Sequence, residues 1–424
     1  MSLAKITEGL KFAGDVSIRK LEIVGSNNYN IDITKQAVKI NVYEDLFSPF
    51  TTLSIVVRES VDFITALPLK GEEIINVEIG TPTMVKQEHI IKGKFYIYKL
   101  SDRMEMNKKS TVYVLHCISY EAMTDLNTRK SKAYRGRVSD IASEIIGKDG
   151  LNTDKNINIE TSINNTKYVS NYWSPIKNLN YIASIGMNMN SSPTYIFFEN
   201  RTGFNFVSLE SLYSADVKQN FIKDDYVRDT DARGNSYINP EEDYKRILDF
   251  KVKTTYDSLA TIPSGTYASR MYTYDLLKKK YTITDYSASD NYLLQKHLND
   301  KALISDYKPV SPLNAMYNQI KHYAVHDGFA DTSVSKTIQE RSSLLQLLDS
   351  NTIEITVLGR TDYTIGQKVH VKLPRPVPFG EKDSNDELVD ASYSGNYIIV
   401  AINHNITNSK HEVTLELAKD SYIG

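Results

Sequence analysis

The alternation of apolar and polar residues near both ends of the chain constrains its fold more than any other feature. In the first ~125 residues, apolar side chains recur at every second position in segments 38–42, 53–57, 75–79, 95–100 and 111–120. This period of two is typical of strands that bury one face. Five or more antiparallel strands of this kind close most naturally into a small barrel or sandwich.

A second β block is predicted in the C-terminal part of the chain. Strand patterns begin again at 246–256, 269–275 and 280–286, and an all-β stretch follows at 352–358, 367–373, 395–404 and 412–417. Each block is about the size of a barrel, so the two could be a duplicated domain. Their sequences are too dissimilar to prove a repeat.

The region between the blocks changes to a helical period. Apolar residues at Val138, Ile141 and Ile145 predict an amphipathic helix that ends at Gly147. Ser174 and Pro175 are a favourable N-cap and first helical residue for a second helix. Strands are expected at 194–199 and 205–208, joined by a turn. We interpret 130–215 as a small α/β module.

The expected fold class is therefore β-rich α+β, with two antiparallel β-barrel domains, an inserted α/β module and additional helices. The predicted divisions are 1–125, 126–215, 216–244 and 245–424, with a helical insertion at about 287–350. Short helices are expected at 61–67, 291–303, 312–326 and 334–348. The charged segment 216–243 and the proline-rich segment 374–392 are predicted to be exposed loops and candidate interface elements, together with the edge strands of both blocks.

Candidate chemical motifs are weak throughout the sequence. Cys117 lies within a strand pattern, where a buried structural cysteine is expected. His322 and His326 have a metal-ligand spacing, but the zincin glutamate is absent and no third ligand is apparent. The segment 229–240 begins like a calcium loop but has Arg233 and Pro240 where oxygen ligands are required.

Neighbouring acids and bases give no stronger signal. Asp224-Asp225 and Glu241-Glu242 lie in a polar loop, where acids are usually hydrated, and Lys278–Lys280 is too small for a nucleic-acid patch. The sequence also has no phosphate-binding glycine loop and no GxSxG motif. We therefore expect no enzyme activity, no catalytic or metal-binding residues and no cofactor.

Composition narrows the possible partners and location. The formal net charge of the 424 residues is −2, which gives no support for bulk binding to nucleic acid or anionic lipid. The single cysteine rules out an internal disulfide, and the N-terminus has no signal-peptide core. A soluble protein folded in a cytoplasm is expected. The 29 tyrosines suit half-buried strands, and less strongly indicate large protein interfaces.

Three stretches resemble baseplate hub proteins of contractile-tailed bacteriophages. The first, 43–80, has an acidic strand end at 43–45 and a Leu-Pro-Leu-Lys-Gly-Glu turn at 67–72. The second, 171–213, has a helix starting at Ser-Pro, a strand ending in Phe-Phe-Glu-Asn, and a following Phe-x-Phe-x-Ser-Leu strand. The third comprises 363–374 and 394–406, which includes Gly-x-Tyr-x-Ile and a later histidine. Together they cover about a quarter of the chain, in the order typical of the family.

The resemblance implies a structural role in the virion tail. Such hubs are homotrimers in which each subunit carries two tail-tube-like barrels, so that six barrels adapt the six-fold tail tube to a three-fold spike. Implied partners are the trimeric central spike, tail tube or tube-initiator proteins, and other baseplate proteins. DNA would pass non-specifically through the channel, and the chain would not insert into a membrane. Assembly would take place in the host cytoplasm.

Three other readings stay open at this point. The chain could be another tail or injection-system component with the hub fold, which only its assembly neighbours would distinguish. A tail-associated glycan hydrolase would need a pair of carboxylates in a cleft. A receptor- or carbohydrate-binding protein would need exposed aromatic platforms, whereas Trp173 is interpreted as a packing residue at a helix start.

Overall fold

The structure is a computed structural model that describes residues 12–25, 29–60, 69–84, 86–107, 110–148, 150–223, 240–303, 311–320, 334–375, 389–407 and 410–423. The helix expected at 61–67 lies outside these residues. The described part is rich in antiparallel strands, and its largest sheet has 13 strands, in which only β13 and β20 pair in parallel. The expectation of a β-rich fold with large antiparallel sheets is thereby confirmed.

The N-terminal block forms one half of this sheet. Its strands are β1 (Ser17–Val24), β2 (Asn30–Asp32), β3 (Ala37–Asp45), β4 (Thr52–Glu59), β5 (Ile74–Gly80), β6 (Ile91–Asn107) and β7 (Ser110–Ser119). They pair in the order β3-β4-β7-β6-β5-β1-β2. The predicted alternation places Leu53, Ile55 and Val57 in a buried cluster with Leu115 and Cys117. A short 3-10 helix, η2 (Gln87–His89), precedes β6.

The C-terminal block forms the other half. Its strands are β13 (Val217–Ile222), β14 (Ile247–Thr254), β19 (Asn351–Leu358), β20 (Lys368–Lys372), β21 (Gly395–Thr407) and β22 (His411–Lys419). They pair in the order β14-β19-β22-β21-β20-β13. A bridge between Ile222 and Arg246 connects the end of β13 to the residue before β14. Side chains from these strands fill a single apolar core.

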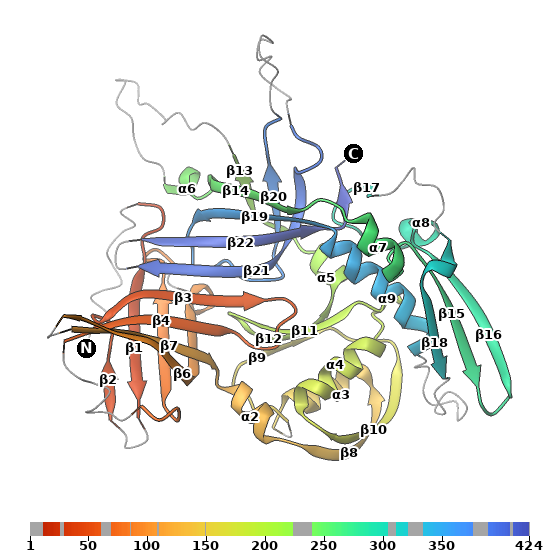
Figure 1. Cartoon of the computed structure of the whole chain (residues 1–424), viewed down its shortest axis with the longest axis horizontal. Coiled ribbons are helices and arrows are strands. Elements are labelled where there is room, and N and C mark those ends of the chain that lie inside the picture. Colours follow the sequence, from red (N-terminus) through yellow and green to blue (C-terminus); the bar gives the residue numbers. More distant parts are fainter. Residues whose placement is uncertain are drawn as a thin grey trace, which may run out of the picture.

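The two halves are joined edge to edge within the chain. Residues 401–407 of β21 pair with residues 39–45 of β3 in an antiparallel ladder, which makes the sheet continuous (Figure 1). Apolar packing follows the same junction. Ile406 of β21 belongs to the core of the N-terminal half, and Leu46 belongs to the core of the C-terminal half.

The two halves also repeat one pairing pattern. The order β3-β4-β7-β6-β5 in the first half corresponds to β14-β19-β22-β21-β20 in the second, and each set follows the chain in the same sequence. The registers agree as well. Leu53 of β4 lies opposite Cys117 of β7, and the corresponding Ile353 of β19 lies opposite Leu417 of β22. This repeat of order and register is what a duplicated domain would produce.

Irregularities in the strands are repeated too. In β6 the register with β7 shifts between Ile97 and Lys99, and in β21 the register with β22 shifts between Ile399 and Ala401. A second pair of shifts follows Ala37 in β3 and Ile247 in β14. Because a bulge adds one residue at a defined place, these matches fix which residues correspond between the halves. The correspondence holds up to further shifts without a counterpart, the first of which lie between Ser101 and Met104 in β6 and between Val252 and Thr254 in β14.

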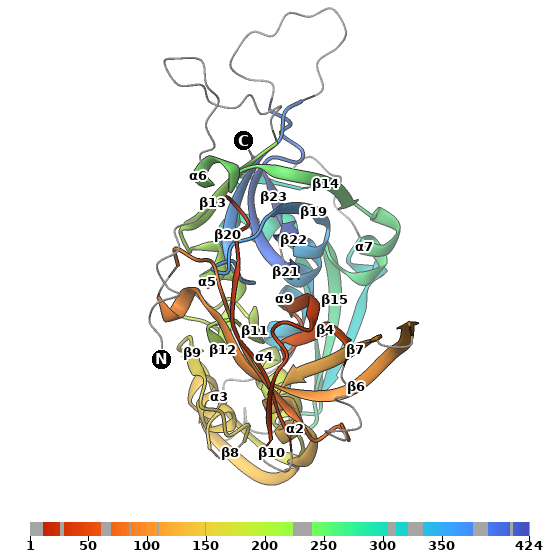
Figure 2. The same cartoon turned by 90° about the vertical axis from the view of Figure 1, so that its left-hand side faces the viewer.

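An α/β region lies below the large sheet in Figures 1 and 2. Its elements are α2 (Glu121–Asn127), β8 (Lys130–Arg137), α3 (Val138–Ile146), β9 (Asn156–Ile159), β10 (Asn165–Trp173), α4 (Pro175–Ile185), β11 (Tyr195–Asn200), β12 (Gly203–Ser208) and α5 (Leu209–Tyr213). Both predicted helices are confirmed. Gly147 follows the last residue of α3, and the Ser174 side chain caps α4 by accepting from the Lys177 N–H.

A small sheet of β15 (Ala268–Asp275), β16 (Lys280–Ser287) and β18 (Met316–Ile320) lies at the right of Figure 1, with helices α7 (Ser258–Ser264) and α8 (Ala288–Asn291). The other elements of this part of the chain are η3 (Tyr292–Leu294), β17 (Lys301–Ala302), η4 (Pro312–Asn314), α9 (Val334–Asp349) and β23 (Ser421–Tyr422). Helix α6 (Pro240–Asp243) lies at the upper left of Figure 1, near β13 and β14. Helix α9 confirms the helix predicted at 334–348, and it contacts α4, β15 and β22.

Three expectations about local structure are wrong. Residues 291–303 hold only the single turn η3 and the short strand β17, and residues 316–320 form strand β18 instead of a helix. Strand β18 pairs with β15, 46 residues away at Arg270–Met316, so a distant partner decided its conformation. The segment 216–243 begins with strand β13, whose one buried apolar residue, Phe221, gave little periodic signal.

Candidate functional site: a polar junction and open strand edges

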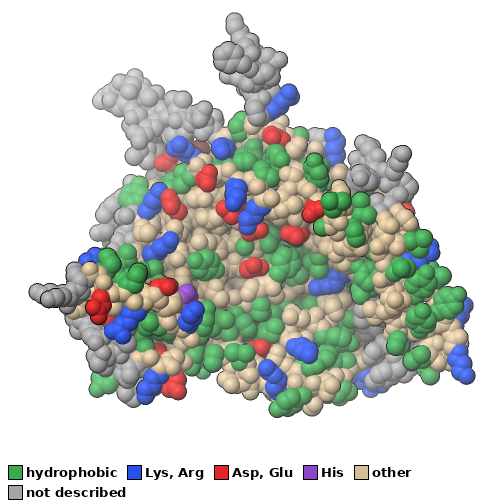
Figure 3. Space-filling model, in the orientation of Figure 1, with side chains coloured by type: hydrophobic (Ala, Val, Ile, Leu, Met, Phe, Trp, Pro, Cys, Tyr) green, Lys and Arg blue, Asp and Glu red, His purple; other side chains and the backbone are tan. Residues whose placement is uncertain are grey.

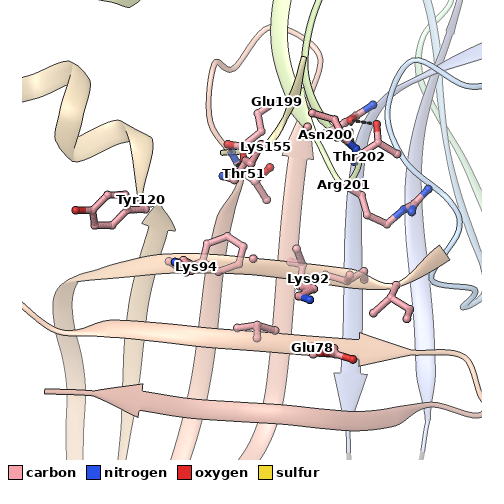
Figure 4. A pocket seen from close by; sticks show the side chains of 18 of the residues that line it. Thr51, Glu78, Lys92, Lys94, Tyr120, Lys155, Glu199, Asn200, Arg201 and Thr202 are labelled. Carbon is pink, nitrogen blue, oxygen red and sulfur yellow. Dashed lines mark hydrogen bonds and ion pairs between the residues drawn. The ribbon is translucent and has the colours of Figure 1, made fainter. Parts of the chain in front are cut away.

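A large hollow lies where the N-terminal half meets the α/β region. Its volume is about 1440 Å³, and it lies between strands β1, β5 and β6 and the turn joining β11 to β12. Figure 4 shows Lys92, Lys94 and Glu78 on the strands, with Glu199 and Arg201 from the opposite side. Charges of both signs line the hollow, so it has no marked preference for anions or cations.

A buried ion cluster closes one side of this hollow. The ammonium of Lys155, just before β9, lies 2.6 Å from Glu121 Oε2 and 2.5 Å from Glu199 Oε1. It also donates to Ser119 Oγ at 2.7 Å. The other oxygen of Glu199 accepts from the Thr51 N–H at 3.0 Å. The cluster therefore ties β4 and β7 of the large sheet to α2, β9 and β11.

Charge pairing controls ionisation in this cluster. Burial alone would raise the pKa of Glu121, but the charge and hydrogen bonds of Lys155 outweigh it and leave that pKa below its usual value. Burial raises the pKa of Glu199 more than Lys155 lowers it. Burial opposes the charge of Lys155, but the two carboxylates raise its pKa overall. Both acids are held in salt bridges, so they make poor candidates for an acid–base pair.

A second buried cluster lies at the junction of the two halves. Glu44 of β3 accepts hydrogen bonds from the Thr364 hydroxyl and the Ile365 N–H. Burial raises the pKa of Glu44 to about 7. Nearby, Asp362 pairs with Lys218 at 2.7 Å and with Arg360 at 2.8 Å. These contacts connect β3 to the loop before β20 and to β13.

No sequence motif predicts these clusters, because their members lie far apart in the chain. Glu121 and Glu199 stand 78 positions apart, and Glu44 and Thr364 stand 320 apart. Each residue alone resembles an ordinary surface charge. The folded structure is needed to show that these charged side chains are buried and join different elements of the chain.

The weak sequence motifs gain nothing from the structure. Cys117 is fully buried, and burial raises the pKa of its thiol. Glu242 in α6 pairs with Lys245 at 2.8 Å. Trp173 packs against Tyr181, with ring centroids 5.5 Å apart, as expected for a packing residue. The motifs at 224–225, 229–234 and 322–326 lie outside the described residues.

Two other features are absent from the described part of the chain. Its His, Cys, Asp and Glu side chains form no group of three or more that could hold a metal ion. None of its helices is both long enough and apolar enough to cross a membrane.

Several surfaces could serve as interfaces. The predicted loop 374–392 contains a bridge between Pro374 and Val389, and its residues 376–388 lie outside the described part. Strands β14 and β2 end the pairing path of the large sheet. The small sheet carries exposed apolar side chains, at the right of Figure 3; they include Leu276, Leu277, Tyr281, Ile283, Met316 and Ile320.

Comparison with solved structures identifies the class of fold. The chain matches the tail protein from Neisseria meningitidis MC58 with a TM-score of 0.54 and 11% identity, over 95% of this chain and 96% of that one. It matches the 43 kDa tail protein of prophage MuSo2 from Shewanella oneidensis with a TM-score of 0.55 and 9% identity, over 95% and 98%. The fold is thus one found in tail proteins.

Sequence comparison narrows this class. The chain is 23% identical to the probable baseplate hub protein gp334 of Vibrio phage KVP40, over 96% of this chain and 95% of that protein. No family model matches the sequence. The resemblance to phage baseplate hub proteins is confirmed by this match across nearly the whole length, and it supports a structural role in the phage baseplate.

Proposed function

We propose that this chain is the central hub of a contractile phage-tail baseplate and acts as a homotrimer. Each copy would contribute two tube-like β-barrels, so that a three-fold ring presents a pseudo-six-fold surface. One face would dock onto the six-fold tail tube or its initiator, and the other would carry the trimeric central spike. The ring would line the channel through which DNA passes without specific contacts.

The observation that carries this proposal is the repeated strand pattern. Two halves with the same pairing order and the same register shifts lie side by side in one sheet. Two equivalent units in each chain are what a three-fold protein needs to match six-fold symmetry. The bridge between Ile222 and Arg246 brings the two ends of the second half together, as a barrel requires.

Separate cores support the proposed division of the chain. Buried residues form three clusters, one centred on each half of the large sheet and a third between Tyr134 and Phe206. The cluster of the C-terminal half also takes in residues of the α/β region, such as Ile196, Phe198 and Val207. We therefore assign 1–125 to a first barrel, 126–215 to an inserted module, 216–244 to a connection that includes β13, and 245–424 to a second barrel with an insertion at about 287–350. The similarity to a phage baseplate hub protein supports a location in the virion tail, and we propose that assembly takes place in the host cytoplasm.

We propose a structural role without enzyme activity, and an assay of cell-wall degradation tests this part. Among the charges that line the large hollow, Glu121 and Glu199 are both bound by Lys155. We expect no degradation by the purified protein. Activity that disappears when one carboxylate is replaced would favour a hydrolase. A role elsewhere in a tail or injection system is the main alternative, and the proteins that bind the chain would distinguish it.

Electron microscopy of the purified protein tests the hub proposal directly. We expect class averages of a three-fold ring with a central channel and six similar lobes, built from three chains of 48.1 kDa. Compact monomers both alone and with the spike protein would contradict the proposal. A ring that appears only after the spike is added would retain it.

A further inference from the structure

We infer that the C-terminal part of β6 in one copy pairs with β14 of the next copy. This contact would repeat between chains the junction that β21 and β3 form within the chain. The contact is inferred from the strand registers, whereas the number of copies in the ring rests on the proposed function.

The repeated pattern determines which strands correspond. The register shift after Ile97 in β6 matches the shift after Ile399 in β21, so Leu100 corresponds to Ile402. Likewise the shift after Ala37 in β3 matches the shift after Ile247 in β14. The internal junction of β21 with β3 therefore has one possible counterpart, which is β6 with β14.

The counterpart strands have open edges where the contact would form. In β21, residues 395–398 pair with β20 and residues 401–407 pair with β3. In β6, residues 91–96 pair with β5, but no described strand pairs with that edge further along. Strand β14 pairs with β19 on one edge. Beyond the bridge at Arg246, no described strand pairs with its other edge. Open edges of this length are usually covered in a native assembly.

Side chains on the open edges of β6 and β14 are more exposed than the corresponding side chains of β21 and β3, as expected if a neighbouring strand is missing. Ile40 of β3 is 1% exposed, whereas the corresponding Phe250 of β14 is only half-buried. Ile402 of β21 is 2% exposed, whereas the corresponding Leu100 of β6 is half-buried. Further along β6, Met104 is 60% exposed. Pairing of the two edges would remove this apolar surface from water.

The internal registers also give the register of the new contact. Within the chain, Asn403 lies opposite Tyr43. The same pairing between copies places Ser101 opposite Lys253. Continued along both strands without a further shift, this register places Met104 opposite Phe250, Arg103 opposite Lys251 and Glu105 opposite Asp249. The two like-charged pairs are unfavourable, so the register rests on the internal junction and on the apolar pair.

A contact of this kind makes rings and not closed pairs. Strand β6 belongs to the first half of the chain and β14 to the second, so each copy uses two different edges. Such head-to-tail contacts continue until the ring closes. Internal and external junctions would then alternate around the ring, with equivalent geometry at each.

Disulfide trapping tests the contact. The double variant Ser101→Cys with Lys253→Cys is oxidised and analysed on non-reducing gels, with Cys117 buried and unreactive. We expect covalent products of two and three chains. The matched control, Tyr43→Cys with Asn403→Cys, should lose its thiols without a change of mass, because that pair lies within one chain. Ser101→Cys with Leu248→Cys is about five residues out of register, roughly 17 Å, and should not cross-link.

The outcomes separate this inference from the hub proposal. A trimer by light scattering that fails to cross-link at positions 101 and 253, while the internal control closes, would overturn the contact and leave the hub proposal in place. A protein that stays monomeric and does not cross-link would overturn the inference that the edges pair unaided. The hub proposal would then be decided by microscopy with the spike.

Discussion

Glu44 makes the stability of this protein depend on pH in an unusual direction. Burial raises its pKa from 4.5 to about 7, so the folded chain keeps a proton that the unfolded chain has lost. Stability contributed by this group therefore falls as pH rises from about 4.5 to 7 and is constant above that. We expect Glu44→Gln to gain stability over the wild type through that window, by up to about 3 kcal/mol.

Urea denaturation at pH 5, 6, 7 and 8 measures this effect as a difference between variant and wild type. Using the difference removes the contribution of other groups, such as His404, whose pKa burial lowers to about 3. Thr364→Val serves as a control, because it removes a hydrogen bond to Glu44 without removing the carboxyl. A difference that is independent of pH would show that Glu44 titrates normally.

Lys155 should be among the most costly single residues to replace. Lys155→Met leaves Glu121 and Glu199 buried without a counter-charge, and loss of one partner from a buried pair costs about 3–5 kcal/mol. The triple variant with Glu121→Gln and Glu199→Gln removes the buried charges and should recover much of the loss. Thermal or urea unfolding of the three proteins checks this. Equal stability of single and triple variants would contradict it.

At the scale of elements, Gly203 holds the β11–β12 turn against β9. Its φ is +137°, and a Cβ there would lie 2.1 Å from the Asn156 carbonyl oxygen. Gly136 also has a positive φ, +153°, but a Cβ there would meet nothing within 4 Å. Gly203→Ala should therefore cost more stability than Gly136→Ala, by about 1–3 kcal/mol. Equal losses in denaturant titrations would exclude the close contact as the cause.

Local sequence signals predicted some elements well and others poorly. Helix α4 was predictable because Ser174 and Pro175 form a cap that acts within one turn. Strand β18 was not, because its pairing with β15 is parallel and distant in the chain. The same limit applies to the site. The Lys155 cluster depends on tertiary contacts between α2, β9 and β11, which no short motif encodes.

At the scale of the whole molecule, the loop 374–392 should matter more to assembly than to folding. Its ends meet in the bridge between Pro374 and Val389, so a short Gly-Ser link can span the same points. We expect the shortened chain to unfold at a similar denaturant concentration and to form fewer rings in electron micrographs. Rings in normal yield would remove this loop from the predicted interface.

The two β blocks were predictable from the sequence, but their relation to each other was not. Alternation in segments such as 53–57 and 353–357 indicated strands in both blocks. The correspondence between the halves appears only in registers and bulges, because the side chains at corresponding positions differ. Ser119, for example, corresponds to the buried Lys419, whose ammonium donates to the carbonyl oxygens of Ser392 and Ser394.

The ladder between β3 and β21 has a mechanical consequence. Its seven opposed residue pairs lie along the strands, side by side. A pull along the strands that separates the two halves would load the hydrogen bonds of this ladder together, in shear. Bonds loaded together resist far more force than bonds that open one after another, as in a zipper. The seam would therefore act as a stiff joint through which thrust passes from one half of the chain to the other.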